Sequence, residues 1–300
     1  MILDGWGKSP DPKVSAIDNA NTPFIDSLYT KYPNAQLRTD GLNVGLPEGQ
    51  MGNSEVGHMN LGAGRIVYQD LAKINLAVAN KTINQEKELV KAFEYAKKNN
   101  KAVHFLGLLS DGGVHSHTSH LRALIDASQE YNLDKVFVHA FTDGRDVDPK
   151  SGALYIEDLT NYIYNTKVKL ASVIGRYYAI DRDKRWERVK LAYDLLLSGM
   201  GTKSKDAALS VLESYKNNVT DEFVAPMLMV DENNNAVATI KNDDVVIFFN
   251  FRTDRGRELT EALSQKDFHE QNMHKLNLYY VTMTNYDDTY SNVHVVYDKD

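Results

Sequence analysis

The chain has 300 residues, of which 42% are hydrophobic and 25% charged, the composition of a globular protein with one large or two ordinary domains. Its formal net charge of −7 argues against a protein that coats nucleic acid or an anionic membrane, because such partners require a basic field. The chain has no cysteine and no apolar run near the roughly 20 residues that span a bilayer, which excludes disulfides, thiolate metal sites and a membrane span and fits a cytoplasmic protein.

The first part of the chain is irregular and rich in glycine. Thr22 followed by Pro23 predicts a helix start, with threonine as the N-cap. Glycine then recurs seven times over 40–65, a density typical of tight turns or of backbone wrapped closely on a ligand. A helical pattern resumes near Gln69, and 85–99 is predicted to be an amphipathic helix. The predicted division is therefore 1–68 and 69–300.

The second predicted domain alternates strands and helices. Apolar runs predict strands at 102–109, 135–141, 169–174, 225–230, 236–240, 244–250 and 276–283. Helices are predicted to begin near 119, 151 and 183, and the last of these is closed by Gly199. The short segment 231–235 predicts a hairpin turn. This order indicates an α/β fold with a mostly parallel sheet, helices on both faces and an antiparallel edge.

Four of the predicted strands run directly into loops rich in glycine, aspartate, histidine and arginine. These loops are 110–117, 142–146, 175–178 and 250–255. Ligands of open α/β sheets bind outside the carboxyl ends of the strands, so the four loops are predicted to meet at one pocket.

Arginines in and near these loops suit a small polyanion. A guanidinium group donates two charge-assisted hydrogen bonds to a carboxylate or phosphate. The candidates are Arg145, Arg176, Arg182, Arg252 and Arg255. For Arg185 and Arg188 the sequence leaves two interpretations open, namely ligand binding and a solvated, salt-bridged helix face.

A serine in the glycine-rich segment is a candidate nucleophile. Ser54 follows Asn53, a possible N-cap, where helical spacing could begin, and a helix start stabilises a phosphoryl anion. On its own, such a glycine-flanked serine is more often part of a plain turn. No base is evident beside Ser54, so a divalent metal is the expected activator, with Asp4 as a candidate ligand.

Histidines cluster after the first strand of the second domain. His115, His117 and His120 could indicate a metal site, but no aspartate or histidine at tight spacing completes one. His115 follows two glycines and is placed to exchange a proton or hydrogen-bond with a phosphate. We therefore assign His115 to the substrate and the other two to structural roles.

Six segments of the chain resemble the metal-dependent, cofactor-independent phosphoglycerate mutases. They are 3–7, 44–58, 62–69, 108–117, 143–146 and 175–186, in the order of the family pattern. The resemblance implies part of an alkaline-phosphatase-like domain and an inserted transferase domain that holds the substrate. It also implies a monomeric, cytoplasmic isomerase of glycolysis without nucleic-acid or membrane partners.

The resemblance also assigns roles to individual residues. It implies that Ser54 becomes phosphoserine while it converts 3-phosphoglycerate into 2-phosphoglycerate, and that Asp4 and Ser54 bind manganese. Two manganese ions and no organic cofactor are expected in the complete enzyme. The residues implied to hold phosphoglycerate are His115, Arg145, Asp146, Arg176, Arg182, Arg252 and Arg255.

The chain departs from the family pattern at its ends. It stops at Asp300, near the point where the transferase domain should return to the phosphatase domain, and 1–5 is typical of the end of a buried strand. We therefore expect a trimmed start, a missing C-terminal half that carries most metal ligands, and no turnover by these residues alone. Two alternatives remain, a hydrolase of the phosphatase superfamily, which has no need of the arginine-rich loops, and a non-catalytic phosphoglycerate-binding module.

Overall fold

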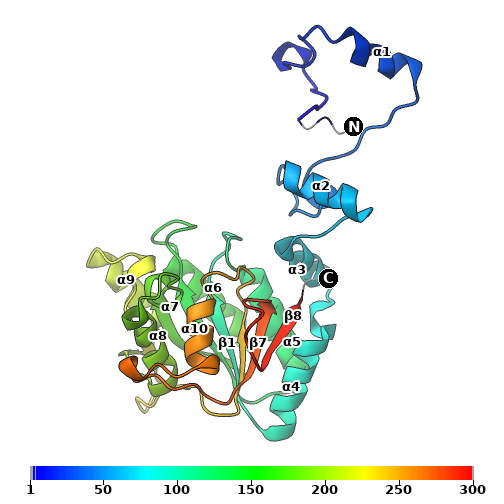
Figure 1. Ribbon diagram of the computed structural model, residues 1–300. Helices are drawn as coiled ribbons and strands as arrows, with labels where there is room; N and C mark the ends of the chain where they lie inside the picture. Colours follow the sequence, from blue (N-terminus) through cyan, green and yellow to red (C-terminus); the bar gives the residue numbers. More distant parts are fainter. Residues whose placement is uncertain (1–2, 4, 299–300) are drawn as a thin grey trace. The chain divides into compact units, whose positions relative to one another are not determined.

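The computed structural model describes residue 3 and residues 5–298, and the chain divides into two compact units, 1–73 and 74–300. The sequence analysis placed the division at 68/69, just before helix α3, Asp70–Ala79. That helix runs across the division between the units. Figure 1 shows the elements with the labels used below.

The first unit consists of short helices joined by irregular segments. Its elements are η1 (Pro12–Val14), α1 (Pro23–Lys31), η2 (Gly41–Val44), α2 (Ser54–Ala63) and the beginning of α3. Thr22 is the N-cap residue of α1, as predicted. Within the described part of this unit, strand pairing is limited to a bridge between Asp40 and Met51. The strand end predicted over 1–5 falls largely outside the described residues.

The second unit is built on an eight-stranded sheet with the order β4-β5-β3-β2-β1-β6-β7-β8. The strands are β1 (Val103–Leu108), β2 (Val136–Thr142), β3 (Val168–Gly175), β4 (Thr202–Ser204), β5 (Met227–Met229), β6 (Val245–Phe248), β7 (Tyr279–Thr284) and β8 (Val293–Tyr297). All neighbouring pairs are parallel except β3 with β5, which confirms a mostly parallel sheet. The central strands are buried along their length, so their sequences are apolar runs without alternation.

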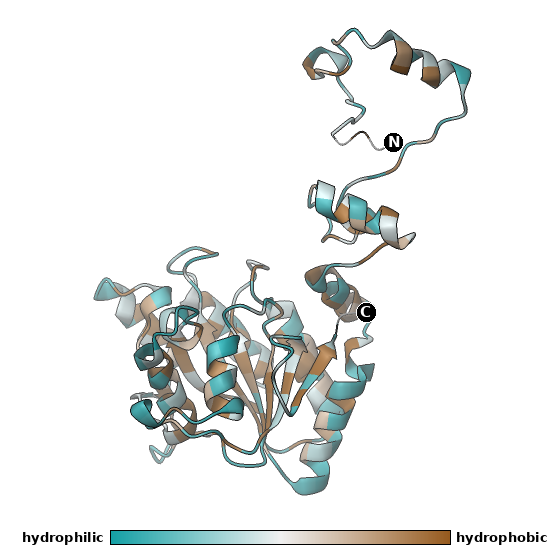
Figure 2. Cartoon of the chain, in the orientation of Figure 1, coloured by the Kyte–Doolittle hydropathy of each residue, from teal (hydrophilic) through white to brown (hydrophobic). Residues whose placement is uncertain are grey.

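Helices cover both faces of this sheet, as predicted. They are α4 (Lys87–Asn99), α5 (Thr118–Glu130), α6 (Gly152–Ile163), α7 (Arg176–Ala179), α8 (Trp186–Ser198), α9 (Ala207–Lys216) and α10 (Arg257–Thr260). Shorter turns are η3 (Ile83–Gln85), η4 (Asp221–Phe223), the π-helical turn η5 (Glu261–Gln265) and η6 (His269–Gln271). Side chains of α8 and α10 share one apolar core with β1, β2, β3, β6 and β7. Figure 2 shows the hydrophobic strands between helices whose outer surfaces are hydrophilic.

Most predicted elements of this unit are confirmed, with errors at the edges of the sheet. The predicted strand 236–240 is wrong, since only the bridge between Val230 and Ala236 forms there after the turn at 231–235. The antiparallel edge is confirmed, but β5 forms it together with β4, which the sequence analysis missed. Strand β8 was also missed. No helix among the described residues is long and apolar enough to cross a membrane.

Candidate functional site

The site begins where the strand order of the second unit changes direction. From β1 the chain continues to β2 and β3 on one side, whereas β6, β7 and β8 lie on the other side. The loops after β1 and β6 are joined, because the His115 carbonyl oxygen accepts hydrogen bonds from the backbone N–H groups of Phe251 (2.8 Å) and Arg252 (3.2 Å). Such a switch point is where open α/β sheets bind ligands.

A buried arginine holds the loops together. Arg176, at the end of β3, has a side chain that is 2% exposed and donates through Nη1 to Asp143 and Asp146, each at 2.6 Å. Its Nη2 lies 3.0 Å from His115 Nε2. Three predicted site residues, His115, Asp146 and Arg176, are therefore in contact, and Asp143 joins them.

The conformation of the loop after β2 follows from its sequence. Gly144 has a φ of +67°, and a Cβ at this position would lie 2.8 Å from the side chain of Asp221. Asp143 Oδ1 accepts hydrogen bonds from the N–H groups of Arg145 (3.1 Å) and Asp146 (3.0 Å). Glycine therefore permits the turn, and Asp143 fixes it so that Asp146 faces Arg176.

The electrostatics of this cluster fix its protonation. Burial, and then the charge of Arg176, lower the pKa of His115 to about 4. Burial opposes the charge of Arg176, but the hydrogen bonds that it donates to Asp146 and Asp143 keep its pKa above the ordinary value. Since guanidinium only donates, His115 Nε2 accepts and the ring proton lies on Nδ1. This buried Nδ1 has no hydrogen-bond partner in the described part of the chain.

An arginine-lined cavity of 320 Å³ adjoins the cluster. Six of its lining residues are Arg145, Arg176, Arg182, Arg185, Arg188 and Arg255. They face three carboxylates, those of Asp181, Asp183 and Glu222. Burial, and then the charges of Arg176, Arg182 and Arg145, lower the pKa of Arg255. Positive groups that raise each other's free energy in this way form a site for an anion, since a bound anion relieves their repulsion.

The remaining predicted arginine, Arg252, is not among the residues that line this cavity. Its Nε and Nη2 donate to the two carboxylate oxygens of Asp254 at 2.9 and 3.3 Å. Arg182 donates to the same carboxylate at 3.0 Å, so Asp254 connects Arg252 to the cavity wall. The sequence analysis missed Asp254 and Asp143 as site residues, although both lie in the loops that it singled out. Each of these two aspartates lies within three positions of a candidate arginine in the sequence, and this spacing could have identified them.

Arg185 and Arg188 show features of both interpretations left open by the sequence. Arg185 bonds to Asp181 at 3.3 Å and Asp183 at 2.5 Å, as a salt-bridged helix start would. Arg188 Cζ lies 3.8 Å from the centre of the Tyr177 ring, a cation–π contact. Both nevertheless line the cavity.

The candidate nucleophile lies in the first unit and is described by itself. Asn53 caps α2 as predicted, since its Oδ1 accepts from the Val56 N–H at 3.1 Å, and Ser54 is the first helical residue. His58 was missed as a neighbour of Ser54, and its Nδ1 lies 3.2 Å from Ser54 Oγ and 2.8 Å from the Ser54 carbonyl oxygen. The shorter contact requires a proton on Nδ1, so that nitrogen cannot also accept the serine proton. The candidate metal ligand Asp4 lies outside the described residues.

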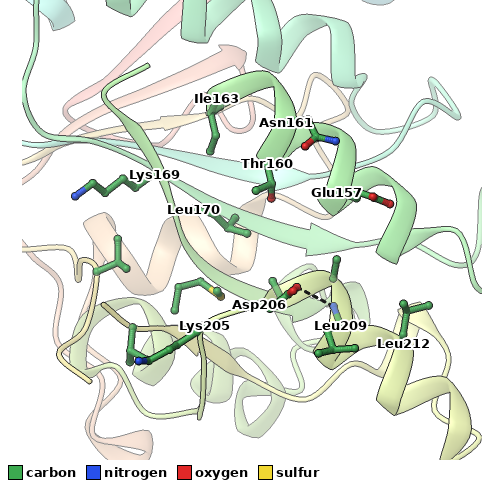
Figure 3. A pocket seen from close by; sticks show the side chains of 15 residues that line it. Glu157, Thr160, Asn161, Ile163, Lys169, Leu170, Lys205, Asp206, Leu209 and Leu212 are labelled. Atoms are coloured by element: carbon green, nitrogen blue, oxygen red, sulfur yellow. Dashed lines mark hydrogen bonds between the residues drawn. The ribbon is translucent and has the colours of Figure 1, made fainter. Parts of the chain in front are cut away.

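A larger cavity of 620 Å³ lies elsewhere in the second unit, among α6, β3 and α9 (Figure 3). Its wall is mainly aliphatic, and none of the predicted site residues contributes to it. Asp206, which caps α9 by accepting from the Leu209 N–H at 2.9 Å, is one of the residues that line it. The smaller arginine-lined cavity therefore has the chemistry for an anion.

Comparison with known proteins identifies relatives of the whole chain. A family model described as "BPG-independent PGAM N-terminus" matches residues 74–288. The 2,3-bisphosphoglycerate-independent phosphoglycerate mutases of Flavobacterium psychrophilum and Flavobacterium johnsoniae are 78% and 79% identical over 300 residues. The enzyme of that name from Bacteroides thetaiotaomicron is 55% identical. In each case the match covers 100% of this chain and 59% of the relative, so the chain spans about three fifths of its curated relatives.

A solved structure extends the similarity to the fold. It is that of Leishmania mexicana phosphoglycerate mutase at low cobalt concentration, which is 30% identical to this chain. The match has a TM-score of 0.72 and covers 96% of this chain and 55% of the other.

Proposed function

We propose, because this chain belongs to the 2,3-bisphosphoglycerate-independent phosphoglycerate mutase family, that it binds phosphoglycerate and supplies the serine nucleophile of that isomerase. The observation that carries the proposal is the cavity lined by six arginines at the strand switch point. Phosphoglycerate carries a phosphate and a carboxylate, and guanidinium groups bind both by paired, charge-assisted hydrogen bonds.

The arginines differ in their proposed tasks. Arg145, Arg182 and Arg255 line the cavity, and the side chains of Arg145 and Arg182 are 57% and 46% exposed, so they can turn toward an anion. Arg252, 44% exposed and paired with Asp254, would exchange that carboxylate for a ligand group. His115 and Asp146 would position the ligand through Arg176, and the neutral His115 has a free Nδ1–H to donate.

The proposed chemistry is a phosphoryl relay through Ser54. The serine oxygen forms a bond to phosphorus as the bond to the glycerate oxygen breaks; the serine proton leaves, and the glycerate oxygen gains a proton. Return of the phosphoryl group to the other hydroxyl reverses these changes. The arginines must retain glycerate between the two steps, because its loss would make the reaction a hydrolysis.

Manganese, with Asp4 and Ser54 among its ligands, belongs to the proposal as the metal that lowers the pKa of the serine hydroxyl when bound. Ser54 is the one expected ligand within the described residues, and one hydroxyl does not fit a two-ion site. The two-ion site is therefore not made by the residues described here. A monomeric state and a cytoplasmic location complete the proposal.

Calorimetric titration of the 300-residue chain with 3-phosphoglycerate tests the binding step. Removing a charge-assisted hydrogen bond costs about 1.5–3 kcal/mol, so Arg255→Ala is expected to weaken binding about 10- to 100-fold. Arg122→Ala is the matched control, because Arg122 pairs with Asp158 on α5 and α6 and does not line the cavity. The proposal would be contradicted if both variants lost the same amount of affinity for 3-phosphoglycerate, or if the unsubstituted chain did not bind it.

Phosphate on Ser54 separates the catalytic proposal from a binding module. The relatives are named mutases. If the reaction passes through a phosphoserine intermediate, Ser54 carries phosphate during turnover. Peptide mapping of this chain extended to the full length of its relatives, after incubation with phosphoglycerate and manganese, is expected to detect it, with Ser54→Ala in the same extended chain as the blank. Binding without phosphoserine would support the non-catalytic module.

A further inference from the structure

The loop between the π-helical turn η5 and strand β7 carries three potential metal ligands that the proposed function does not use. They are Asp267, His269 and His274, and one ligand atom from each lies within 4.8 Å of the others. Asp267 Oδ2 lies 3.8 Å from His274 Nδ1, and the two imidazole rings are 5.7 Å apart. All three side chains are exposed.

The backbone of this loop is held in a fixed turn. Phe268 and Met273 exchange hydrogen bonds in both directions, at 2.8 and 3.1 Å, and Asn272 adopts a φ of +49° between them. Met273 is fully buried, which anchors the turn to the core. The Tyr193 hydroxyl of α8 accepts from the His274 N–H at 2.9 Å and donates to the His274 carbonyl oxygen at 2.7 Å.

The carboxylate is oriented as well. Asp267 Oδ1 accepts from the Lys275 N–H at 2.9 Å, which leaves Oδ2 directed at His274. The ammonium group of the neighbouring Lys266 pairs with Glu261 at 2.8 Å and lies 5.0 Å from the centre of the Phe268 ring. Within the described residues this lysine therefore has partners other than the Asp267 carboxylate.

We propose that Asp267, His269 and His274 bind a divalent transition-metal ion of the zinc class. Two imidazoles and one carboxylate are ligands that zinc accepts, with bonds of about 2.0–2.2 Å and a fourth position for water. Rotation of the exposed side chains can close the observed separations to that range, because the backbone already places the three on one side of the turn. The hard ions manganese and magnesium prefer oxygen ligands and bind such a site less well.

The site differs from the proposed phosphoglycerate and manganese sites. None of its ligands lines the arginine cavity, and the loop enters the amino end of β7 rather than following the carboxyl end of a strand. Zinc binding here and phosphoryl transfer at Ser54 can therefore be tested independently.

Calorimetry or equilibrium dialysis of the metal-free 300-residue chain with zinc chloride tests the proposal. The doubly substituted chain His269→Ala, His274→Ala is expected to bind one zinc ion fewer, and either single substitution to weaken that ion about tenfold or more. Glu270→Gln is the matched control, since Glu270 lies in the same turn but outside the cluster, and it should retain the ion. Ser54→Ala should also retain it.

Two results would overturn the assignment. One is an unchanged zinc stoichiometry and affinity in the double variant. The other is a loss of zinc binding in Glu270→Gln as large as that in the double variant. Thermal unfolding without metal should be the same in all variants, because the altered side chains are exposed. With zinc, the parent chain should show a rise in Tm that the double variant lacks.

Discussion

Arg176 differs from the other candidate arginines in that its guanidinium group is buried and contacts three other side chains. It is 2% exposed and bridges Asp143, Asp146 and His115, which come from the loops after β1 and β2. Its main effect is therefore to organise the walls of the site. The residues that we propose to contact phosphoglycerate directly are Arg145, Arg182 and Arg255, which line the cavity.

We expect Arg176→Ala to lower the free energy of unfolding by about 3–5 kcal/mol, because it leaves two partly or fully buried carboxylates without their cation. Urea denaturation followed by circular dichroism measures this. Arg145→Ala is the comparison, since its side chain is 57% exposed and makes one bond of 3.4 Å to Glu222. It should cost no more than about 0.5–1 kcal/mol. A similar loss in both variants would show that Arg176 does not have this organising role.

At the residue scale, the sequence predicted which loops bring their side chains together. It did not predict which acidic side chain each arginine pairs with. The candidates follow strand ends, so one topological rule places them at one edge of the sheet. Whether a guanidinium faces solvent or a carboxylate depends on loop conformation, which single-residue patterns do not determine. Asp143 and Asp254 were missed for this reason, because an acid beside an arginine is typical both of a site and of an exposed ion pair.

At the scale of strands and helices, the sequence predicted the long buried elements and missed the short polar ones. Strands β1, β2 and β6 lie in the middle of the sheet, where burial on both faces demands apolar runs. Strand β4 has three residues, two of them exposed, so hydrophobicity gives no signal for it. The wrongly predicted strand 236–240 follows the turn at 231–235, joins the sheet region through one bridge, and has only Ile240 buried.

A row of buried polar side chains crosses these central strands. His104 on β1 lies 3.3 Å from Asp244 and 3.0 Å from His139 on β2, and His139 lies 2.7 Å from Ser172 on β3. Asp244 accepts from His104 Nε2, so His104 Nδ1 accepts from His139 Nε2, and His139 Nδ1 accepts from the Ser172 hydroxyl. Both imidazoles are therefore neutral donors and acceptors, and a second proton on either would break the row.

We expect this row to make stability fall in mild acid. Burial lowers the pKa of both His104 and His139 in the folded state. Below pH about 6.5 the unfolded state therefore binds protons that the folded state does not bind. The stability is fully present above that pH and is lost as the pH falls, by about 1.4 kcal/mol per pH unit for each histidine. Urea denaturation at several pH values measures the slope.

The contribution of the row can be separated from that of other histidines. Burial also lowers the pKa values of His115, His117 and His120, so part of the slope will persist in any variant of the row. The double variant His104→Gln, His139→Gln should show a shallower slope whatever its absolute stability. An unchanged slope would mean that the two imidazoles do not titrate with folding.

At the scale of the whole molecule, the second unit contains all the proposed phosphoglycerate ligands except the nucleophile. The seven substrate-binding candidates lie within 74–300, and the family model also matches inside it. The helix that crosses the division belongs partly to this unit, because Asn75 Oδ1 of α3 accepts a hydrogen bond from His120 Nε2 at 2.7 Å. A chain that begins at Asp70 therefore keeps the whole helix and the complete sheet.

We expect residues 70–300 alone to fold cooperatively and to bind 3-phosphoglycerate with an affinity within about threefold of the 300-residue chain. The reason is that charge-assisted bonds from the arginines provide the binding free energy, and none of these residues is removed. Calorimetry on both chains, each with its own Arg255→Ala variant, measures the comparison. If the shorter chain folds but binds at least about tenfold more weakly, the first unit contributes to ligand binding by some 1.4 kcal/mol or more, and the division of labour proposed here is wrong. If the two chains bind equally and Arg255→Ala lowers the affinity of both by the same factor, the second unit holds the ligand by itself.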